Sequence, residues 1–207
     1  MSSSKINGLY VVTDTTVQSR YSHVELAELA LKGGAKIIQL RDKKLHAIEL
    51  LKIGNKIREL CDEHGATSIV NDRIDLAYAS QSHGVHLGQN DLPIGSARSI
   101  LGENKIVGGT ASEISDAVSV EKNGADYVGF GHIYPTQTKT KEYEPRGLST
   151  LKEVKNNLSI PVVAIGGINK ENAREVIEAG ADSIAVSSAV CAAEDPVKAS
   201  EYLAELF

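Results

Sequence analysis

Polar side chains that can bind an anion alternate along one short apolar stretch of the sequence. Residues 36–43 read Lys-Ile-Ile-Gln-Leu-Arg-Asp-Lys, a pattern typical of a strand that leads into a loop. Because strand side chains alternate between two faces, Gln39, Arg41 and Lys43 share one direction, and the apolar residues between them share the other. Burying an arginine and a lysine together is costly without negative partners. An anionic ligand is the favoured partner, and internal carboxylates are the alternative.

An aspartate follows each of two further predicted strands that are neighbours in the sequence. Asn71 and Asp72 come directly after residues 67–70, and Asp91 follows residues 84–87. Two carboxylates beside substrate phosphates are the ligands that Mg²⁺ prefers, with water completing its shell. The alternative is that both aspartates cap the helices that follow them. The nearby cations favour the metal site.

Two turns of small residues predict a site for a phosphate group. Gly166 and Gly167 follow the apolar strand at 161–165, and Ser187 and Ser188 follow the strand at 183–186. Glycine lets backbone N–H groups approach a ligand closely, and N–H groups at helix starts favour anions. In (β/α)8 barrels such a site is commonly built after the seventh and eighth strands. The alternative is that the glycines serve packing alone.

The remaining candidates are a hydroxyl group, two histidines and a long loop. Thr110 follows a predicted strand at 105–107, where it can bind a polar edge of a substrate. His86 and His132 are weaker candidates, because a histidine on a strand is more often a hydrogen-bonded core residue. Residues 132–147 form the longest irregular stretch and are rich in Pro, Thr and Lys. This loop is interpreted as a lid over an anion, with an exposed polar loop as the alternative.

Composition limits the classes of protein and partner. At 207 residues the chain fits one domain with a sizeable core, and its net charge of −5 argues against nucleic acid as the main partner. No apolar run approaches the ~20 residues of a membrane span, and the start lacks the apolar core of a signal peptide. Cys61 and Cys191 form no metal or disulfide motif. These features indicate a protein of the reducing cytoplasm.

Alternating strand and helix patterns predict an α/β fold, a (β/α)8 TIM barrel of one domain over residues 1–207. A Gly-Ala dipeptide precedes several of the apolar strands, which indicates a repeated βα unit. The expected strands are 9–13, 36–40, 67–70, 84–87, 105–107, 126–130, 161–165 and 183–186. The expected helices are 23–32, 47–63, 73–79, 95–101, 112–123, 149–156, 170–179 and 196–206. An open doubly wound sheet is the alternative, but its glycine fingerprint is missing after the first strand.

Six motifs spread over nearly the whole chain closely resemble those of thiamine phosphate synthases. They are QLRDK (39–43), VNDRIDLA (70–77), GVHLGQNDLP (84–93), YVGFGHIYPTQTK (127–139), VVAIGGI (162–168) and IAVSSAV (184–190). The resemblance implies a barrel enzyme, a transferase, with two small-molecule substrates. It would join 4-amino-5-hydroxymethyl-2-methylpyrimidine diphosphate to 4-methyl-5-(2-hydroxyethyl)thiazole phosphate, giving thiamine phosphate and pyrophosphate.

The resemblance also implies roles for particular residues. The residues expected at the pyrimidine diphosphate are Gln39, Arg41, Lys43, Asn71 and Lys139, and those expected at the thiazole phosphate are Thr136, Thr138, Gly167, Ser187 and Ser188. Thr110 is expected to bind substrate through its hydroxyl. Asp72 and Asp91 are expected to hold Mg²⁺. Arg41, Lys43, Lys139 and Thr110 are the expected catalytic residues, because the cations would neutralise charge on departing pyrophosphate. The family often has serine at position 110, and threonine keeps the hydroxyl group.

Two other functions remain as alternatives. A thiazole tautomerase resembles the synthase in fold and thiazole site, but would use an acid–base residue such as histidine and would need no Mg²⁺ pair. A non-catalytic sensor of a phosphorylated ligand would need neither the metal pair nor the cations. The presence of Asp72, Asp91 and Lys139 favours the synthase. The sequence leaves open whether the chain forms a homo-oligomer.

Overall fold

Eight parallel strands pair in the order of the sequence and close into a barrel. The computed structural model describes residues 6–136 and 144–207. Its strands are β1 (Gly8–Thr13), β2 (Ile37–Leu40), β3 (Thr67–Asn71), β4 (Gly84–Leu87), β5 (Ile106–Ala111), β6 (Tyr127–Gly131), β7 (Val162–Ile165) and β8 (Ser183–Val186). β8 pairs with β1, with Leu9 opposite Ile184, so the sheet has no edge. The predicted (β/α)8 fold is confirmed.

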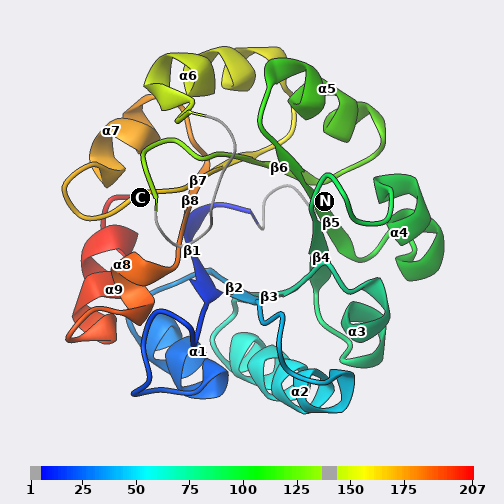
Figure 1. The fold of residues 1–207 in the computed structure, drawn as a ribbon, viewed down its shortest axis with the longest axis vertical. Coiled ribbons are helices and arrows are strands. Elements are labelled where there is room, and N and C mark those ends of the chain that lie inside the picture. Colours follow the sequence, from blue (N-terminus) through cyan, green and yellow to red (C-terminus); the bar gives the residue numbers. More distant parts are fainter. Residues whose placement is uncertain (1–5, 137–143) are drawn as a thin grey trace.

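The helices form a ring around the barrel (Figure 1). They are α1 (His23–Lys32), α2 (Ala47–Glu63), α3 (Ile74–Ala79), α4 (Ile94–Leu101), α5 (Ile114–Lys122), α6 (Gly147–Asn157), α7 (Ala173–Glu178), α8 (Ser188–Cys191) and α9 (Pro196–Ala204). Every predicted helix is present, and the short α8 is an addition. Capping residues in the sequence determine where several of the helices begin. Ser22 and Glu25 form a capping box at α1, and Asp195 caps α9, whose first residue is proline.

β5 runs four residues further than the sequence analysis predicted. The prediction ended at residue 107, but Gly108 and Gly109 lie inside the strand. A Cβ atom at Gly108 would lie 2.1 Å from Cζ of Tyr127, so the missing side chain leaves room for that ring inside the barrel. Thr110 therefore lies on β5, with its hydroxyl inside the barrel mouth, rather than in the loop after it.

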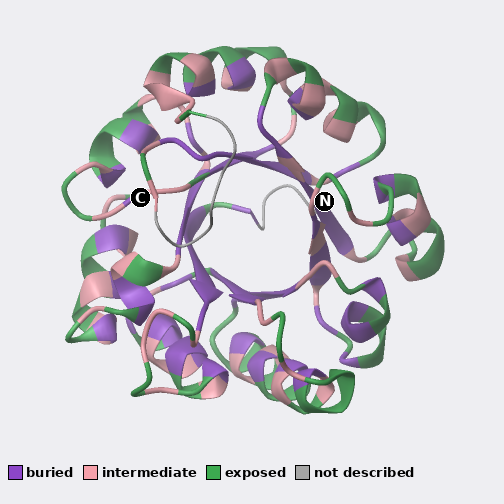
Figure 2. Ribbon diagram, in the orientation of Figure 1, coloured by how far each residue is buried: buried purple, intermediate pink, exposed green. Residues whose placement is uncertain are grey.

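Apolar side chains form two separate cores. The larger core lies between the strands and the helices and includes Ile38 and Leu40, as the alternation in β2 predicted. The smaller core fills the inside of the barrel, with Tyr10, Ile37 and Tyr127 among its members. Figure 2 shows the result: most strand residues are buried, apart from a few towards the C-terminal ends, while each helix is buried only on its inner side. A filled barrel interior leaves its C-terminal mouth as the place for a ligand.

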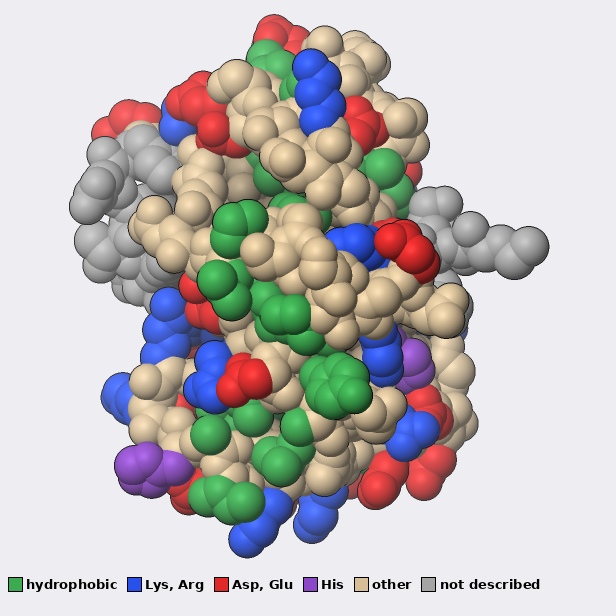
Figure 3. Space-filling model, turned by 90° about the vertical axis from the view of Figure 1, so that its right-hand side faces the viewer, with side chains coloured by type: hydrophobic (Ala, Val, Ile, Leu, Met, Phe, Trp, Pro, Cys, Tyr) green, Lys and Arg blue, Asp and Glu red, His purple; other side chains and the backbone are tan. Residues whose placement is uncertain are grey.

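The outer surface is mixed in character. On the side that Figure 3 shows, hydrophobic side chains lie among basic and acidic ones. Large exposed hydrophobic residues include Tyr78 on α3 and Ile100 on α4. Over residues 6–136 and 144–207, no helix is long and apolar enough to cross a membrane. Cys61 and Cys191 are both buried free thiols, in keeping with the absence of a disulfide motif.

Candidate active site

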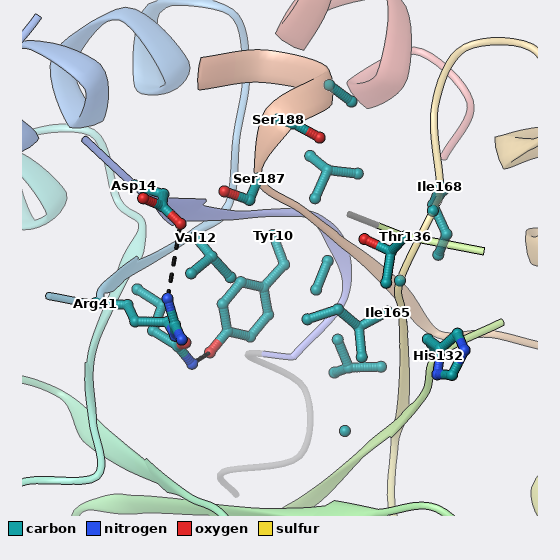
Figure 4. A pocket seen from close by; sticks show the side chains of 18 of the residues that line it. Tyr10, Val12, Asp14, Arg41, His132, Thr136, Ile165, Ile168, Ser187 and Ser188 are labelled. Carbon is teal, nitrogen blue, oxygen red and sulfur yellow. Dashed lines mark hydrogen bonds and ion pairs between the residues drawn. The ribbon is translucent and has the colours of Figure 1, made fainter. Parts of the chain in front are cut away.

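A cavity of about 630 Å³ lies at the C-terminal ends of the strands. It is lined by residues from strands on all sides of the barrel, as Figure 4 shows for part of its wall. Eight of the residues predicted from the sequence line it, namely Gln39, Arg41, Asn71, Thr110, Thr136, Gly167, Ser187 and Ser188. The topology thus brings together residues that are up to 149 positions apart in the chain, from 39 to 188.

The cationic side of the cavity is anchored by a carboxylate that the sequence analysis did not single out. Arg41 Nη1 lies 3.6 Å from Oδ2 of Asp14, which follows β1 and is buried (Figure 4). Asp14 also accepts hydrogen bonds from the backbone N–H and the hydroxyl of Thr16. An internal carboxylate is therefore one partner of Arg41. Because Arg41 also lines the cavity, its guanidinium remains placed to meet an anionic ligand.

Asp42 holds the loop that carries Arg41 and Lys43. Its Oδ1 accepts hydrogen bonds from the backbone N–H groups of Lys44 and Leu45, and its Oδ2 lies 3.2 Å from Nε2 of buried His23. Burial raises the pKa of Asp42, but the hydrogen bonds from Leu45 and Lys44 and the contact with His23 outweigh it, so the net pKa lies below its usual range. The charged form of Asp42 therefore belongs to the folded state.

This lowered pKa predicts a loss of stability in acid. A carboxyl whose folded-state pKa is depressed contributes stability above its ordinary pKa of 3.8 and loses it as pH falls through the lower folded value. Replacing Asp42 with alanine is expected to lower the midpoint of urea unfolding at neutral pH and to flatten its decline below about pH 4. Urea titrations at several pH values measure both effects. Glu59→Ala, on the exposed side of α2, should leave the acid decline unchanged.

Asp72 and Asp91 lie beside each other, with a lysine close by. Lys43 Nζ is 3.6 Å from Asp72 Oδ2, and Asp91 Oδ2 accepts a hydrogen bond from the Gly88 N–H at 2.7 Å. Burial first, and then the neighbouring Asp91 carboxyl, raise the pKa of Asp72 above its usual range despite Lys43 and Arg41. Two carboxylates that disfavour each other's charge suit a bound cation.

Neither aspartate caps a helix, so the alternative interpretation of this pair is wrong. The N-cap residue of α3 is Arg73, and that of α4 is Pro93. Asp72 has a φ of 63°, an uncommon value for a residue with a side chain. The described residues contain no group of three or more His, Cys, Asp or Glu side chains that could hold a metal by themselves. A pair of carboxylates fits Mg²⁺ bound jointly with phosphate and water.

The glycine turn after β7 passes very close to neighbouring backbone. Gly167 has a φ of 68°, and a Cβ atom there would lie 2.5 Å from the carbonyl oxygen of Pro135. Ile133 N and Tyr134 N donate to the carbonyl oxygens of Ile165 and Gly166, which fastens the segment after β6 to this turn. The packing role proposed as an alternative is therefore present. The same turn also lines the cavity, so these glycines can pack against the neighbouring backbone and still be accessible to a ligand.

A chain of hydrogen bonds crosses the floor of the cavity. Gln39 Nε2 donates to the Tyr10 hydroxyl at 2.7 Å, and the Tyr10 and Tyr127 hydroxyls are 3.0 Å apart. The Tyr127 hydroxyl lies 3.0 Å from His86 Nδ1, and His86 Nε2 lies 2.9 Å from the Thr110 hydroxyl. Desolvation by burial raises the pKa of both tyrosines, so they remain protonated. His86 is thus a hydrogen-bonded interior residue, as predicted.

Part of the loop at 132–147 lies outside the described residues. Thr138 and Lys139 fall there, within residues 137–143 of the predicted lid, so these expectations stay predictions. Of the remaining loop residues, Thr136 lines the cavity, and Arg146 N donates to the carbonyl oxygen of His132. The described part of the loop therefore begins and ends beside the cavity.

The sequence as a whole matches a known family. A family model described as thiamine monophosphate synthase matches residues 9–190. The chain belongs to this family. The resemblance of its motifs is confirmed, and the expected enzyme class, a transferase, is the class of the synthase family.

Individual synthases agree with this assignment over almost their whole length. The chain is 47% identical to a thiamine-phosphate synthase of Methanospirillum hungatei, and the match covers 96% of this chain and 97% of that protein. It is 48% identical to a thiamine-phosphate synthase of Methanocella arvoryzae, and that match covers 94% of this chain and 92% of that protein. Among solved structures, a thiamine phosphate pyrophosphorylase from Pyrococcus furiosus superposes with a TM-score of 0.89 at 42% identity, covering 98% of this chain and 95% of that chain. A 3-hexulose-6-phosphate synthase, at 19% identity and a TM-score of 0.74, shares the fold alone.

Four residues of the site in this member of the synthase family were missed by sequence reasoning. Asp14 contacts Arg41, Tyr10 contacts Gln39 and Tyr127 contacts His86. His23 contacts Asp42, in the loop that carries Arg41 and Lys43. Tyr10 and Tyr127 read as ordinary core aromatics in apolar strands. Gly108 was an available signal for Tyr127, because a glycine inside a buried strand often faces a large side chain from its neighbour. Asp14 and His23 carry no local signal of their partners.

Proposed function

We propose that the chain is a thiamine-phosphate synthase that joins a pyrimidine diphosphate to a thiazole phosphate and releases pyrophosphate. The observation that supports this proposal is one cavity whose wall carries two separate groups of candidate anion-binding residues, from different strands of the barrel. One side presents Gln39, Arg41 and Asn71, and the other presents the turn at Gly167 and the start of α8 at Ser188. The relatives' name gives thiamine phosphate as the product, and a cavity that accepts two phosphorylated precursors supports the proposal that this chain forms it.

The cationic side suits the diphosphate. Arg41 lines the cavity, and the exposed side chain of Lys43 lies 3.6 Å from Asp72, outside the residues that line it. Pyrophosphate leaves from a CH2 group on the pyrimidine ring, whose amino group stabilises the cation that remains. Positive side chains near the leaving oxygens neutralise the charge that builds there, which lowers the barrier. Lys139, outside the described residues, is proposed to add to this charge. The C–O bond breaks with its electron pair going to pyrophosphate.

Asp72 and Asp91 are proposed to hold Mg²⁺. The raised pKa of Asp72 beside Asp91 supports this, because two adjacent carboxylates gain from a shared cation. When bound, the ion supplies charge neutralisation to the pyrophosphate oxygens. Lys43 lies 3.6 Å from Asp72, so the lysine is proposed to orient the carboxylate and to add positive charge beside the metal pair.

The glycine and serine side is proposed to hold the thiazole phosphate. Backbone N–H groups of the turn at Gly166 and Gly167 and those at the start of α8 can converge on phosphate oxygens. Thr136, Thr138, Ser187 and Ser188 would add hydroxyl groups. With its phosphate fixed there, the thiazole nitrogen lies across the cavity from the pyrimidine and donates its electron pair to the CH2 carbon. Positioning supplies much of the rate, so no protein nucleophile is required.

Gly167→Ala tests the thiazole phosphate side. The new methyl group would meet Pro135 O at 2.5 Å in a backbone conformation that alanine rarely adopts. The turn is expected to shift, raising KM for thiazole phosphate by roughly tenfold or more and destabilising the fold by about 1–3 kcal/mol. Steady-state kinetics and urea unfolding measure the two effects. Gly95→Ala is the matched control, because a Cβ atom there meets open space, and neither quantity should worsen. An unchanged KM in Gly167→Ala would place the phosphate elsewhere.

The decisive experiment follows both products with and without Mg²⁺. The two precursors are mixed with the purified chain, and pyrophosphate and thiamine phosphate are quantified over time. Equal amounts of both products, formed only with Mg²⁺, are expected. Turnover that is unaffected by chelation would remove the metal from the proposal. Binding of thiazole phosphate without any product would overturn the synthase and favour the tautomerase or the sensor.

A further inference from the structure

Each group in the hydrogen-bonded chain on the cavity floor can donate only a limited number of hydrogen bonds. A tyrosine or threonine hydroxyl has one proton to donate, a neutral histidine has one N–H, and the Gln39 amide offers either N–H groups or a carbonyl oxygen. In the described part of the molecule, the Tyr10 hydroxyl has two partners, Gln39 and Tyr127. Because Tyr10 is buried, leaving its proton without an acceptor is costly.

These limits leave two arrangements in which every proton along the chain has an acceptor. When Gln39 donates to Tyr10, Tyr10 must donate to Tyr127, and Tyr127 must donate to His86 Nδ1. The proton of His86 then lies on Nε2 and is donated to Thr110, whose own proton points into the cavity. This is the arrangement with the amide orientation that the structure has.

The second arrangement runs in the opposite direction. If the Gln39 amide turns over, its carbonyl oxygen accepts from Tyr10, which accepts from Tyr127. His86 then carries its proton on Nδ1, and Thr110 donates to Nε2. A doubly protonated His86 would donate to both Tyr127 and Thr110 and so would break the link between the two ends, but the two arrangements are those of the neutral imidazole. The two ends of the chain are therefore linked, although Gln39 and Thr110 lie on β2 and β5.

We propose that this chain couples the Gln39 amide to the Thr110 hydroxyl, so that one offers an acceptor to the substrate when the other offers a donor. In the observed arrangement, Gln39 keeps its carbonyl oxygen and Thr110 its O–H for the cavity. An aminopyrimidine carries the complementary groups, an amino donor and a ring-nitrogen acceptor. Tyr10, Tyr127 and His86 are thus positioning residues for recognition of the pyrimidine. This inference rests on the proposed function for the identity of the ligand, but the coupling itself is a property of the free protein.

The coupling is tested first without substrate, by NMR of protein with ¹⁵N-labelled histidine. The two imidazole nitrogens report directly which of them carries the proton. Wild-type His86 is expected to be a single tautomer with the proton on Nε2. A His86→Gln variant assigns its signals among those of the six histidines.

The decisive variant is Gln39→Glu, measured at alkaline pH where the new carboxyl is ionised. A carboxylate can only accept, so Tyr10 must reverse, and the proton of His86 is expected to move to Nδ1 although position 39 does not touch that ring. Adding Tyr127→Phe should abolish this response, because the middle link is then missing. A His86 tautomer that stays on Nε2 in Gln39→Glu, or that moves equally without the Tyr127 hydroxyl, would overturn the coupling.

Kinetics then test the link to recognition. Tyr127→Phe is expected to lower kcat/KM for the pyrimidine diphosphate by roughly tenfold, about the effect of one mispositioned hydrogen bond, with KM for thiazole phosphate unchanged. Tyr202→Phe, which is half exposed on α9, is the control and should keep wild-type kinetics. An equal loss for both substrates would indicate general disruption and would contradict a role in reading the pyrimidine. If wild type shows no synthase activity, the proposed function fails, while the NMR result still decides the coupling.

Discussion

Replacing Asp72 with asparagine is expected to reduce Mg²⁺-dependent turnover by about 10²- to 10³-fold, since the loss of a metal ligand removes several kcal/mol of charge stabilisation at the leaving group. Asparagine keeps the shape of the side chain but has no negative charge for a cation. Thiazole phosphate affinity should not change, because the turn at Gly167 lies across the cavity. Single-turnover rates and equilibrium binding of thiazole phosphate measure the two effects separately.

The same substitution should not weaken the metal-free fold, which separates a metal role from a structural one. The pKa of Asp72 is raised by burial and by Asp91, so its charged form destabilises the folded state at neutral pH. That penalty disappears as pH falls through the raised pKa, and asparagine removes it at every pH. The melting temperature of Asp72→Asn without Mg²⁺ should therefore equal or exceed that of wild type. Asp75→Asn, on the exposed side of α3, is the control for turnover. A lower melting temperature together with full activity would mean that Asp72 is structural.

The fold could be predicted because its signals are local and repeated. Each βα unit carries its own apolar strand and helix, several helices are followed by a glycine stop, and the eight strands close into a barrel. The error in β5 arose where tertiary packing overrode a local preference. Gly108 and Gly109 disfavour a strand in isolation, but Gly108 leaves room for the Tyr127 ring and Gly109 for Val120, and both lie inside the strand.

Residues of the candidate site could be predicted where the alternation of side chains along a strand determines the face on which each side chain lies. Alternation in β2 placed Gln39 and Arg41 in the cavity, since Ile38 and Leu40 had to face the helices. The partners of these residues were not predictable in this way. Asp14 meets Arg41, and Tyr10 meets Gln39, only because β1 and β2 are adjacent in the barrel. Such contacts depend on which strands are neighbours and on how their residues align, and the sequence pattern of one strand does not give this information.

Arg41→Ala is expected to lower kcat/KM for the pyrimidine diphosphate by about 10²- to 10³-fold, for two separate reasons. The first is the loss of a cation beside the departing pyrophosphate. The second is that Asp14, buried and 3.6 Å from the guanidinium, would keep its negative charge at the cavity wall without the arginine. An uncompensated carboxylate there repels the diphosphate and is costly to the fold. Steady-state kinetics measure the total loss, and Arg58→Ala, on the outer face of α2, should show none.

A second substitution separates these two causes. In Arg41→Ala with Asp14→Asn, the repelling charge is absent, so only the loss of the cation remains. About tenfold of the lost kcat/KM should return, and the unfolding midpoint should rise towards that of wild type. Asp14→Asn alone should cost less than Arg41→Ala, because the arginine stays in place and keeps its charge. If the double variant is as slow as Arg41→Ala, Asp14 serves only to orient the arginine. If Arg41→Ala itself retains wild-type kcat/KM, the diphosphate lies elsewhere, and the assignment of the cationic side of the cavity is wrong.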